Sequence, residues 1–296
     1  MISGPTATGK TELGIKLAQR LNSVIINADS RQIYQELDIG TAKPTPLQRA
    51  QVPHHLIDWV APTVAITVAQ YQQQVQQLLT RWHGQGKIPL LVGGSGLYLQ
   101  AVVQGLCIPP VAPQHELRQQ LATYSQRERY HFLQQIDPLS ADKIHPHDPV
   151  RTLRALEVYY VTGTPLSQLQ GQRIPPYPVL FLYLDSEQLH QRIRQRTHHM
   201  MAQGLVAETQ FLRQKYGDDL PLLKTLGYRE IGDYLQGRLT LEQAQTLIIR
   251  HTQQLAKRQR TWFRAQTGLV HINSDRPDCA DYSWQKVQEF LTAIRY

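Results

Sequence analysis

The chain reads GPTATGKT at residues 4–11, which matches the pattern Gly-x4-Gly-Lys-Thr of a phosphate-binding P-loop. In such a loop the backbone N–H groups point at phosphate oxygens, and the helix that follows adds positive partial charge at its N-terminus. We expect Lys10 to reach the terminal phosphate and Thr11 to hold Mg²⁺ through its hydroxyl. The loop therefore predicts a protein that works on a phosphorylated or pyrophosphorylated small molecule.

The segment before the loop is short. Only Met1, Ile2 and Ser3 precede Gly4, whereas a P-loop ordinarily follows a buried strand of about five residues. Either the first strand is truncated or the true start lies upstream, and the sequence leaves both alternatives open.

Beyond the loop, short apolar runs alternate with longer helical patterns. The runs lie at 24–29 (VIINAD), 88–93, 179–185 and 269–273, and the helical patterns lie at 10–21, 67–82, 189–203 and 241–263. This alternation is typical of an α/β fold, here a P-loop NTPase-like parallel sheet flanked by helices. We expect residues 1–112 and 174–296 to form this catalytic core.

Residues 113–173 interrupt the alternation. They carry helical patterns at 116–124 and 152–161 but no convincing strand, and Pro-rich stretches at 109–113 and 175–178 flank them. We expect a helical insertion domain here.

Bulk composition narrows the class of partner and compartment. The net charge of +8 favours a polyanionic partner such as nucleic acid. Cys107 and Cys279 are far apart and form no Cys-x-x-Cys pair, so the sequence predicts neither a disulfide framework nor a zinc site. No run approaches the roughly 20 apolar residues of a membrane span, and no signal peptide is evident. We expect a soluble, cytoplasmic monomer.

Two further loops are expected at the edge of the sheet where ligands bind, beyond the carboxyl ends of the strands. Asp29 ends the run VIINAD and can serve as a Mg²⁺ ligand, as a general base or as the cap of a following helix. Asp185 is an alternative for the metal-linked role, although Ser186 and Glu187 after it favour helix capping. The turn GGSGLY at 93–98 brings the Ser95 hydroxyl to this edge, or else is a close-packed turn into a helix.

Basic residues gather in two helical patterns. RHTQQLAKRQRTWFR at 250–264 suits a phosphate backbone, with Lys257 and Arg258 among its cations; the alternative is a solvated face with its aromatic residues in the core. Arginines after the run at 179–185 can clamp a departing or transferring phosphate; they are Arg192, Arg194 and Arg196. The histidine pairs at 54–55 and 145–147 lack a convincing third metal ligand.

Seven motifs together carry a family resemblance. They are GPTATGKT (4–11), DSRQIYQELDIGTAKP (29–44), PHHLID (53–58), LLVGGSGLY (90–98), DP…A…IHPHDPVRTLRALEV (137–158), TLGYRE (225–230) and AKRQRTWFR (256–264). In this order and spacing the set resembles the tRNA dimethylallyltransferase family over nearly the whole chain. The family moves a dimethylallyl group from dimethylallyl diphosphate to N6 of adenosine 37, beside the anticodon of tRNAs that read codons beginning with U.

The resemblance implies a role for each motif. Asp29 would take a proton from the adenine amine, Ser95 would guide the flipped base, and Arg229 would help to stabilise the departing diphosphate. The family usually has Thr at the position of Ser95, so the hydroxyl is kept here and only the packing methyl group is missing. The implied cofactor is Mg²⁺ on Thr11, without zinc, as in the shorter bacterial form. The implied diphosphate-binding residues are Gly4, Pro5, Thr6, Ala7, Thr8, Gly9, Lys10 and Thr11. The expected tRNA contacts are Asp29, Ser30, Arg31, Gln32, Ser95, Arg118, Val150, Arg151, Thr152, Leu153, Arg154, Lys224, Thr225, Leu226, Gly227, Tyr228, Arg229, Lys257 and Arg258.

Two other functions remain as alternatives. A small-molecule kinase would use the same loop, acid and arginines for phosphoryl transfer from ATP, although the basic helix with Trp262 argues against it. A nucleotide-switched RNA-binding protein is the second alternative, and the chain lacks the Asn-Lys-x-Asp motif that its GTPase version would need.

Overall fold

The computed structural model describes residues 1–294 and divides into two compact units. The first unit comprises Met1–Ala65, Val75–Leu99 and Tyr177–Tyr296, and the second comprises Ile66–Gln74 and Gln100–Pro176. The expected insertion at 113–173 lies inside the residues of the second unit. No helix within residues 1–294 is long and apolar enough to cross a membrane.

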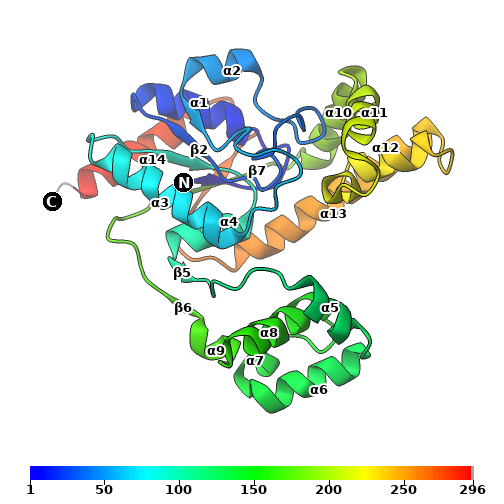
Figure 1. Cartoon of the computed structure of the whole chain (residues 1–296). Coiled ribbons are helices and arrows are strands. Elements are labelled where there is room, and N and C mark those ends of the chain that lie inside the picture. The colour runs from blue at the N-terminus through cyan, green and yellow to red at the C-terminus, as the bar shows by residue number, and fades with distance from the viewer. Residues whose placement is uncertain (295–296) are drawn as a thin grey trace. The chain divides into compact units, whose positions relative to one another are not determined.

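A parallel sheet forms the centre of the first unit (Figure 1). Its strands are β1 (Ile2–Ser3), β2 (Ile25–Asn27), β3 (His54–His55), β4 (Leu90–Val92), β7 (Phe181–Asp185) and β8 (Leu269–Asn273), in the order β3-β2-β4-β1-β7-β8. All pairings in this sheet are parallel, so the predicted α/β class is confirmed. The four predicted strands are present as β2, β4, β7 and β8. The sequence did not indicate β3, because two histidines show no apolar pattern.

Strand β1 has two residues and yet lies at the centre of the sheet. Ile2 pairs with Val92 of β4 on one side and with Leu182 of β7 on the other. The amino group of Met1 donates a hydrogen bond to the carbonyl oxygen of Leu180 at 2.7 Å. The P-loop therefore starts directly from the middle of the sheet, even though its strand is short.

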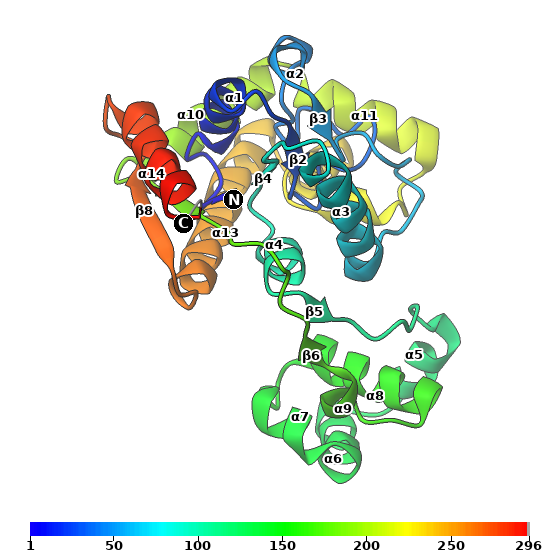
Figure 2. The same cartoon turned by 90° about the vertical axis from the view of Figure 1, so that its left-hand side faces the viewer.

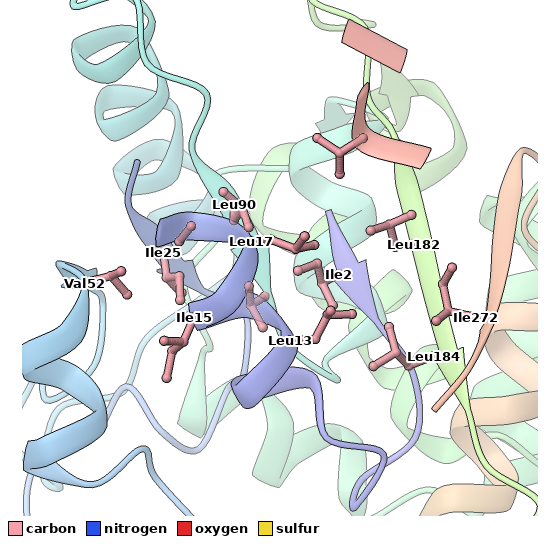
Figure 3. Packing of buried hydrophobic residues seen from close by; sticks show 13 residues of the cluster. Ile2, Leu13, Ile15, Leu17, Ile25, Val52, Leu90, Leu182, Leu184 and Ile272 are labelled. Carbon is pink, nitrogen blue, oxygen red and sulfur yellow. The ribbon is translucent and has the colours of Figure 1, made fainter. Parts of the chain in front are cut away.

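Alternating side chains on the strands build two layers of core. Leu182 and Leu184 of β7 join Ile2 in a cluster with Leu13 and Leu17 of α1 (Lys10–Arg20), as Figure 3 shows. Tyr183 points to the other face, where its ring lies 5.5 Å from that of Phe263 in α13 (Leu241–Arg264). Helix α14 (Cys279–Ala293) packs beside α1 on the first face.

The predicted helices at 10–21, 67–82, 189–203 and 241–263 correspond to helices whose ends differ by one residue at most. These are α1, α3 (Val68–His83), α10 (Leu189–Ala202) and α13. Thr240 starts α13 with a capping box to Gln243, which explains why the sequence located this end well. Helices α10 and α13 pack together (Figures 1 and 2). Helices α11 (Leu205–Tyr216) and α12 (Tyr228–Leu235) also pack together. The further helices of this unit are α2 (Pro46–Gln51), α4 (Gly96–Val103) and the 3₁₀ helix η1 (Pro221–Lys224).

The second unit is mainly helical. It contains α5 (His115–Ala122), α6 (Gln126–Ile136), α7 (Pro138–Lys143), α8 (Pro149–Thr162) and α9 (Leu166–Leu169) around a core with Leu133 and Leu156. Helix α8 begins three residues before the predicted pattern, because Asp148 caps it and Pro149 occupies its first turn. The expectation of no strand at 113–173 was wrong in one detail: β6 (Gly171–Gln172) pairs antiparallel with β5 (Leu106–Cys107).

Candidate active site

The P-loop is shaped by backbone conformations that only some residues adopt. Gly4 has φ of 148°, and a Cβ there would lie 2.1 Å from the carbonyl oxygen of Leu184. Ala7 and Gly9 are in the left-handed region, with φ of 66° and 85°. The hydroxyl of Thr8 donates to the carbonyl of Pro5 at 2.9 Å and braces the loop from within. Gly9 is the N-cap residue of α1 and has no side chain that could accept a hydrogen bond from the first turn. The first N–H groups of α1 are therefore available to an anion.

Two cations lie against this loop. Lys10 donates from Nζ to the carbonyl oxygen of Pro5 at 2.5 Å, and Arg196 of α10 donates from Nη1 to the hydroxyl of Thr6 at 3.1 Å. Burial and, after it, the charge of Arg196 lower the pKa of Lys10 to about 7, while the charge of Asp29 opposes both. Burial also lowers the pKa of Arg196, again against the charge of Asp29. Phosphate binding would relieve the repulsion between these two cations.

Of the other two arginines expected to clamp phosphate, Arg192 lines a smaller cavity together with Thr8 and Gly9 of the loop. Arg192 donates to the carbonyl of Ser274 and pairs with Asp275 at 2.8 Å. Arg194 is exposed and does not line the cavity described below. Of the three, Arg196 donates a hydrogen bond to the loop.

Asp29 is held in a tight turn after β2. Its Oδ1 accepts the N–H of Arg31 at 2.9 Å, and its own N–H donates to the side chain of Asn27 at 3.1 Å. The interpretation of Asp29 as a helix cap was wrong, because the next helix, α2, begins only at Pro46. Within residues 1–294 no hydrogen-bond donor contacts Oδ2, so this half-buried carboxylate keeps one oxygen for a ligand.

Ser95 lies beside that turn. Its Oγ accepts the N–H of Ser30 at 2.9 Å and lies 3.2 Å from the Ser30 hydroxyl. The Ser95 N–H in turn donates to the carbonyl of Ala28 at 3.1 Å. A Cβ on Gly93 would lie 2.1 Å from that same carbonyl, so the two loops meet backbone to backbone.

Asp185 pairs with an arginine of α13. Its Oδ1 accepts two hydrogen bonds from Arg260 of α13, at 3.0 and 2.7 Å. The expectation that Asp185 caps the next helix was wrong, because Asp275 accepts the N–H groups of Glu187 and Gln188 instead. Asp185 therefore anchors α13 to the end of β7.

A cavity of about 740 Å³ joins these features within the first unit. The P-loop contributes Thr6 to its lining, and apolar residues of α10 and α13 form part of its wall, among them Ile193 and Ile248. Its lining includes the following predicted site residues: Thr6, Asp29, Ser30, Arg31, Ser95, Lys224, Thr225, Leu226, Gly227, Tyr228 and Arg258. Side chains far apart in the sequence thus converge on one space.

Arg229 is a predicted site residue that does not line this cavity. It is exposed, and its Nη2 donates to Oε1 of Glu230 at 2.7 Å. Glu230 is buried and accepts the N–H of Gly227 at 2.8 Å through its other oxygen. In this structure Arg229 supports the turn between η1 and α12, and its expected contact with diphosphate stays a prediction.

One face of the basic helix α13 is buried and another is exposed. Phe263 is fully buried, while Lys257 and Arg258 are exposed and have no ion-pair partner among residues 1–294. The buried Phe263 agrees with the alternative that places the aromatic residues in the core, and binding of a phosphate backbone by the exposed cations stays a prediction.

Sequence reasoning missed two residues that shape the site. Gln259 contacts both the P-loop and Gly94, and its position inside AKRQRTWFR was the only signal for it. Glu208 accepts the N–H groups of Asp38, Ile39 and Gly40 and the hydroxyl of Tyr228. No local pattern indicates such an acceptor.

The expected tRNA contacts of the second unit have distinct environments. Arg118 and Arg154 both bind the fully buried carboxylate of Glu157, at 2.7 and 2.6 Å. Thr152 is buried and donates to the carbonyl of Asp148. Val150 and Arg151 are exposed, and Leu153 is half-buried. Val150 and Arg151 are therefore the most accessible of this group.

The residues present suit a metal held mainly by substrate. Thr11 is half-buried in the first turn of α1. Within the described part of the chain no three His, Cys, Asp or Glu residues are grouped to hold a metal ion. Mg²⁺ ordinarily uses few protein oxygens together with substrate phosphates and water, which this arrangement allows.

Comparison with known proteins adds independent findings. The IPP transferase family model matches residues 32–266. The tRNA dimethylallyltransferase of Cyanothece sp. (strain PCC 7425 / ATCC 29141) is 59% identical over 275 residues, which are 93% of this chain and 92% of that protein. The enzyme of the same name from Trichormus variabilis is 54% identical over 98% of both chains.

Solved structures agree with these relatives. The full-length tRNA isopentenylpyrophosphate transferase of Bacillus halodurans is 35% identical, with a TM-score of 0.73 over 99% of this chain and 94% of that one. A eukaryotic dimethylallyltransferase, described as acting on tRNA, is 27% identical, with a TM-score of 0.85 over 99% of this chain and 79% of that one.

Proposed function

The chain belongs to the IPP transferase family, and we propose that it transfers a dimethylallyl group from dimethylallyl diphosphate to N6 of adenosine 37 in tRNAs reading codons that begin with U. The products are N6-(dimethylallyl)adenosine in tRNA and free diphosphate. One observation carries the proposal: Thr6 of the P-loop, the carboxylate of Asp29 and the basic helix residue Arg258 line the same cavity.

The P-loop serves as the site of the leaving group. The N-terminus of α1, Lys10 and Arg196 supply positive charge where diphosphate binds. As the bond from the allylic C1 to oxygen breaks, the electron pair goes to diphosphate. Preorganised donors at this position lower the barrier, because they meet the charge as it develops.

Asp29 serves as the general base. The N6 amine forms its bond to C1 and loses a proton, and Oδ2 of Asp29 accepts that proton. The hydrogen bond from the Arg31 N–H to Oδ1 holds the carboxylate in place. Ser95 orients the turn through its contact with the Ser30 N–H, so that the base meets the target nucleotide in a fixed direction.

Mg²⁺ is the proposed cofactor. The hydroxyl of Thr11, together with diphosphate oxygens, would hold it beside the first turn of α1. When bound, Mg²⁺ supplies positive charge that stabilises the departing diphosphate.

The tRNA is proposed to contact exposed cations around the cavity. Arg31, Lys224, Lys257 and Arg258 are all exposed, and each cation that neutralises a phosphate adds salt-dependent affinity. We also propose that the helical residues 113–173, with Arg151 exposed among them, contact tRNA. A tRNA substrate favours a cytoplasmic location.

One assay tests the proposal against a P-loop kinase. The protein is incubated with unmodified tRNA and Mg²⁺, and with either labelled dimethylallyl diphosphate or γ-labelled ATP. We expect prenyl label to enter tRNA and to disappear when adenosine 37 is replaced by guanosine. Phosphate transfer from ATP without any prenyl label in tRNA would refute the proposal.

A further inference from the structure

Gln259 of α13 connects two loops of the active site. Its Oε1 accepts the N–H of Thr6 in the P-loop at 2.9 Å, and its Nε2 donates to the carbonyl of Gly94 at 2.9 Å. Thr6 offers a donor and Gly94 an acceptor, so the amide needs both of its polar atoms: the oxygen accepts from the P-loop and the nitrogen donates to the second loop. A carboxylate could accept from Thr6 but could not donate to Gly94.

The second loop fits closely around this helix. A Cβ on Gly94 would lie 2.7 Å from Nε2 of Gln259, and a Cβ on Gly96 would lie 2.6 Å from the ring of Trp262. Gln259 and Trp262 are three residues apart and therefore share a face of α13. The two glycines thus allow α13 to approach the loop that carries Ser95.

These contacts lie between the leaving-group site and the base. Thr6 is held at its hydroxyl by Arg196 and at its N–H by Gln259. Gly94 precedes Ser95, which binds the N–H of the residue after Asp29. The amide of Gln259 is therefore a direct side-chain link from the diphosphate loop to the loop that supports the base.

We propose that Gln259 is a positioning residue: its amide sets the separation between the P-loop and the Ser95 loop, and thereby the distance over which the N6 amine attacks C1. The inference rests on the proposed function. A misplacement of about 1 Å in such a geometry can cost about 10²-fold in rate, and the loss falls on the chemical step.

Gln259→Met tests this role, because methionine keeps the length of the side chain and removes both hydrogen bonds. Gln254→Met, at an exposed position of the same helix, is the matched control. With both substrates saturating, we expect the single-turnover rate of Gln259→Met to fall about 10²-fold, while its Kd for tRNA stays within twofold of wild type. Hydrogen exchange of the P-loop segment with Thr6 should accelerate in this variant alone. An unchanged single-turnover rate, or a loss that saturating tRNA restores, would overturn the proposal.

Gln259→Glu adds a pH signature. The ionised carboxylate faces the carbonyl of Gly94 without a donor, whereas the protonated acid donates to it. The rate of this variant relative to wild type should therefore rise as the pH falls from 8 towards about 5, near the ordinary range of glutamic acid. The same ratio for Gln259→Met should stay flat, and a flat ratio for both variants would overturn the proposal. If the wild type itself transfers no prenyl group, the proposed function fails, whereas hydrogen exchange at Thr6 still tests the link between the loops.

Discussion

Replacing Arg196 by Met should remove most of the turnover, and the structure sets the size of the effect. The guanidinium contacts Thr6 at 3.1 Å beside the P-loop, so methionine removes a preorganised donor from the site of the leaving group. Loss of one such donor costs about 10²–10³-fold in kcat, or about 3–4 kcal/mol of transition-state stabilisation. The cost should appear in kcat at saturating tRNA.

The same variant should change the pH dependence. In the wild type the pKa of Lys10 is lowered to about 7 by burial and then by Arg196. Lys10 must carry its proton to bind diphosphate well, so kcat/KM for the donor should fall as the pH rises above 7. Without Arg196 the pKa of Lys10 rises, and this fall should begin at a higher pH.

Measurement of kcat and of kcat/KM for dimethylallyl diphosphate at saturating tRNA between pH 6 and 9 checks both effects. Arg20→Met, at the end of α1 in an exposed pair with Asp281, is a control that removes the same charge outside the cavity. A variant at Arg196 with turnover within threefold of wild type would refute the assignment. A descending limb at the same pH in both proteins would refute the coupling to Lys10.

Three further predictions follow from other contacts. Asp29→Asn should lower the single-turnover rate by about 10²–10⁴-fold and leave the Kd for tRNA nearly unchanged; near-normal turnover would show that the base is another residue. Lys257→Ala should weaken tRNA binding and reduce the slope of log K against log salt by about 1, with kcat at saturating tRNA intact. Glu157→Gln should lower the free energy of unfolding by about 2–3 kcal/mol at pH 7, since it breaks a buried ion pair whose arginines remain partly solvated. Burial alone would raise the pKa of Glu157, but hydrogen bonds, first from Arg118, lower it to about 2. This stabilisation is present above the ordinary value of 4.5 and is lost as the pH falls through 2, so denaturation curves of variant and wild type should converge in acid.

The fold was largely predictable because its signals are local. The P-loop pattern, the apolar runs of β2, β4, β7 and β8, and the capping box of α13 each depend on residues close together in the chain. The short strand β1 was not predictable as a central strand, because its stability comes from pairing with Val92 and Leu182 on both sides. A strand of two residues is too short to show a sequence pattern that would indicate these pairings.

For the site, the sequence by itself determined which loops carry chemistry: the P-loop, the turn at Asp29, the glycine turn at Ser95 and the basic helix. Only the tertiary structure decided which side chains meet there. Of the three candidate arginines, Arg196 donates a hydrogen bond to the P-loop. Arg229 donates to Glu230 instead of lining the cavity, and Arg118 pairs with the buried carboxylate of Glu157. The tertiary structure also brought in Gln259, whose two partners lie 253 and 165 residues away. The physical reason is that a phosphate-binding loop is encoded by local backbone conformation, whereas the partner of a charged or amide group depends on where distant elements pack.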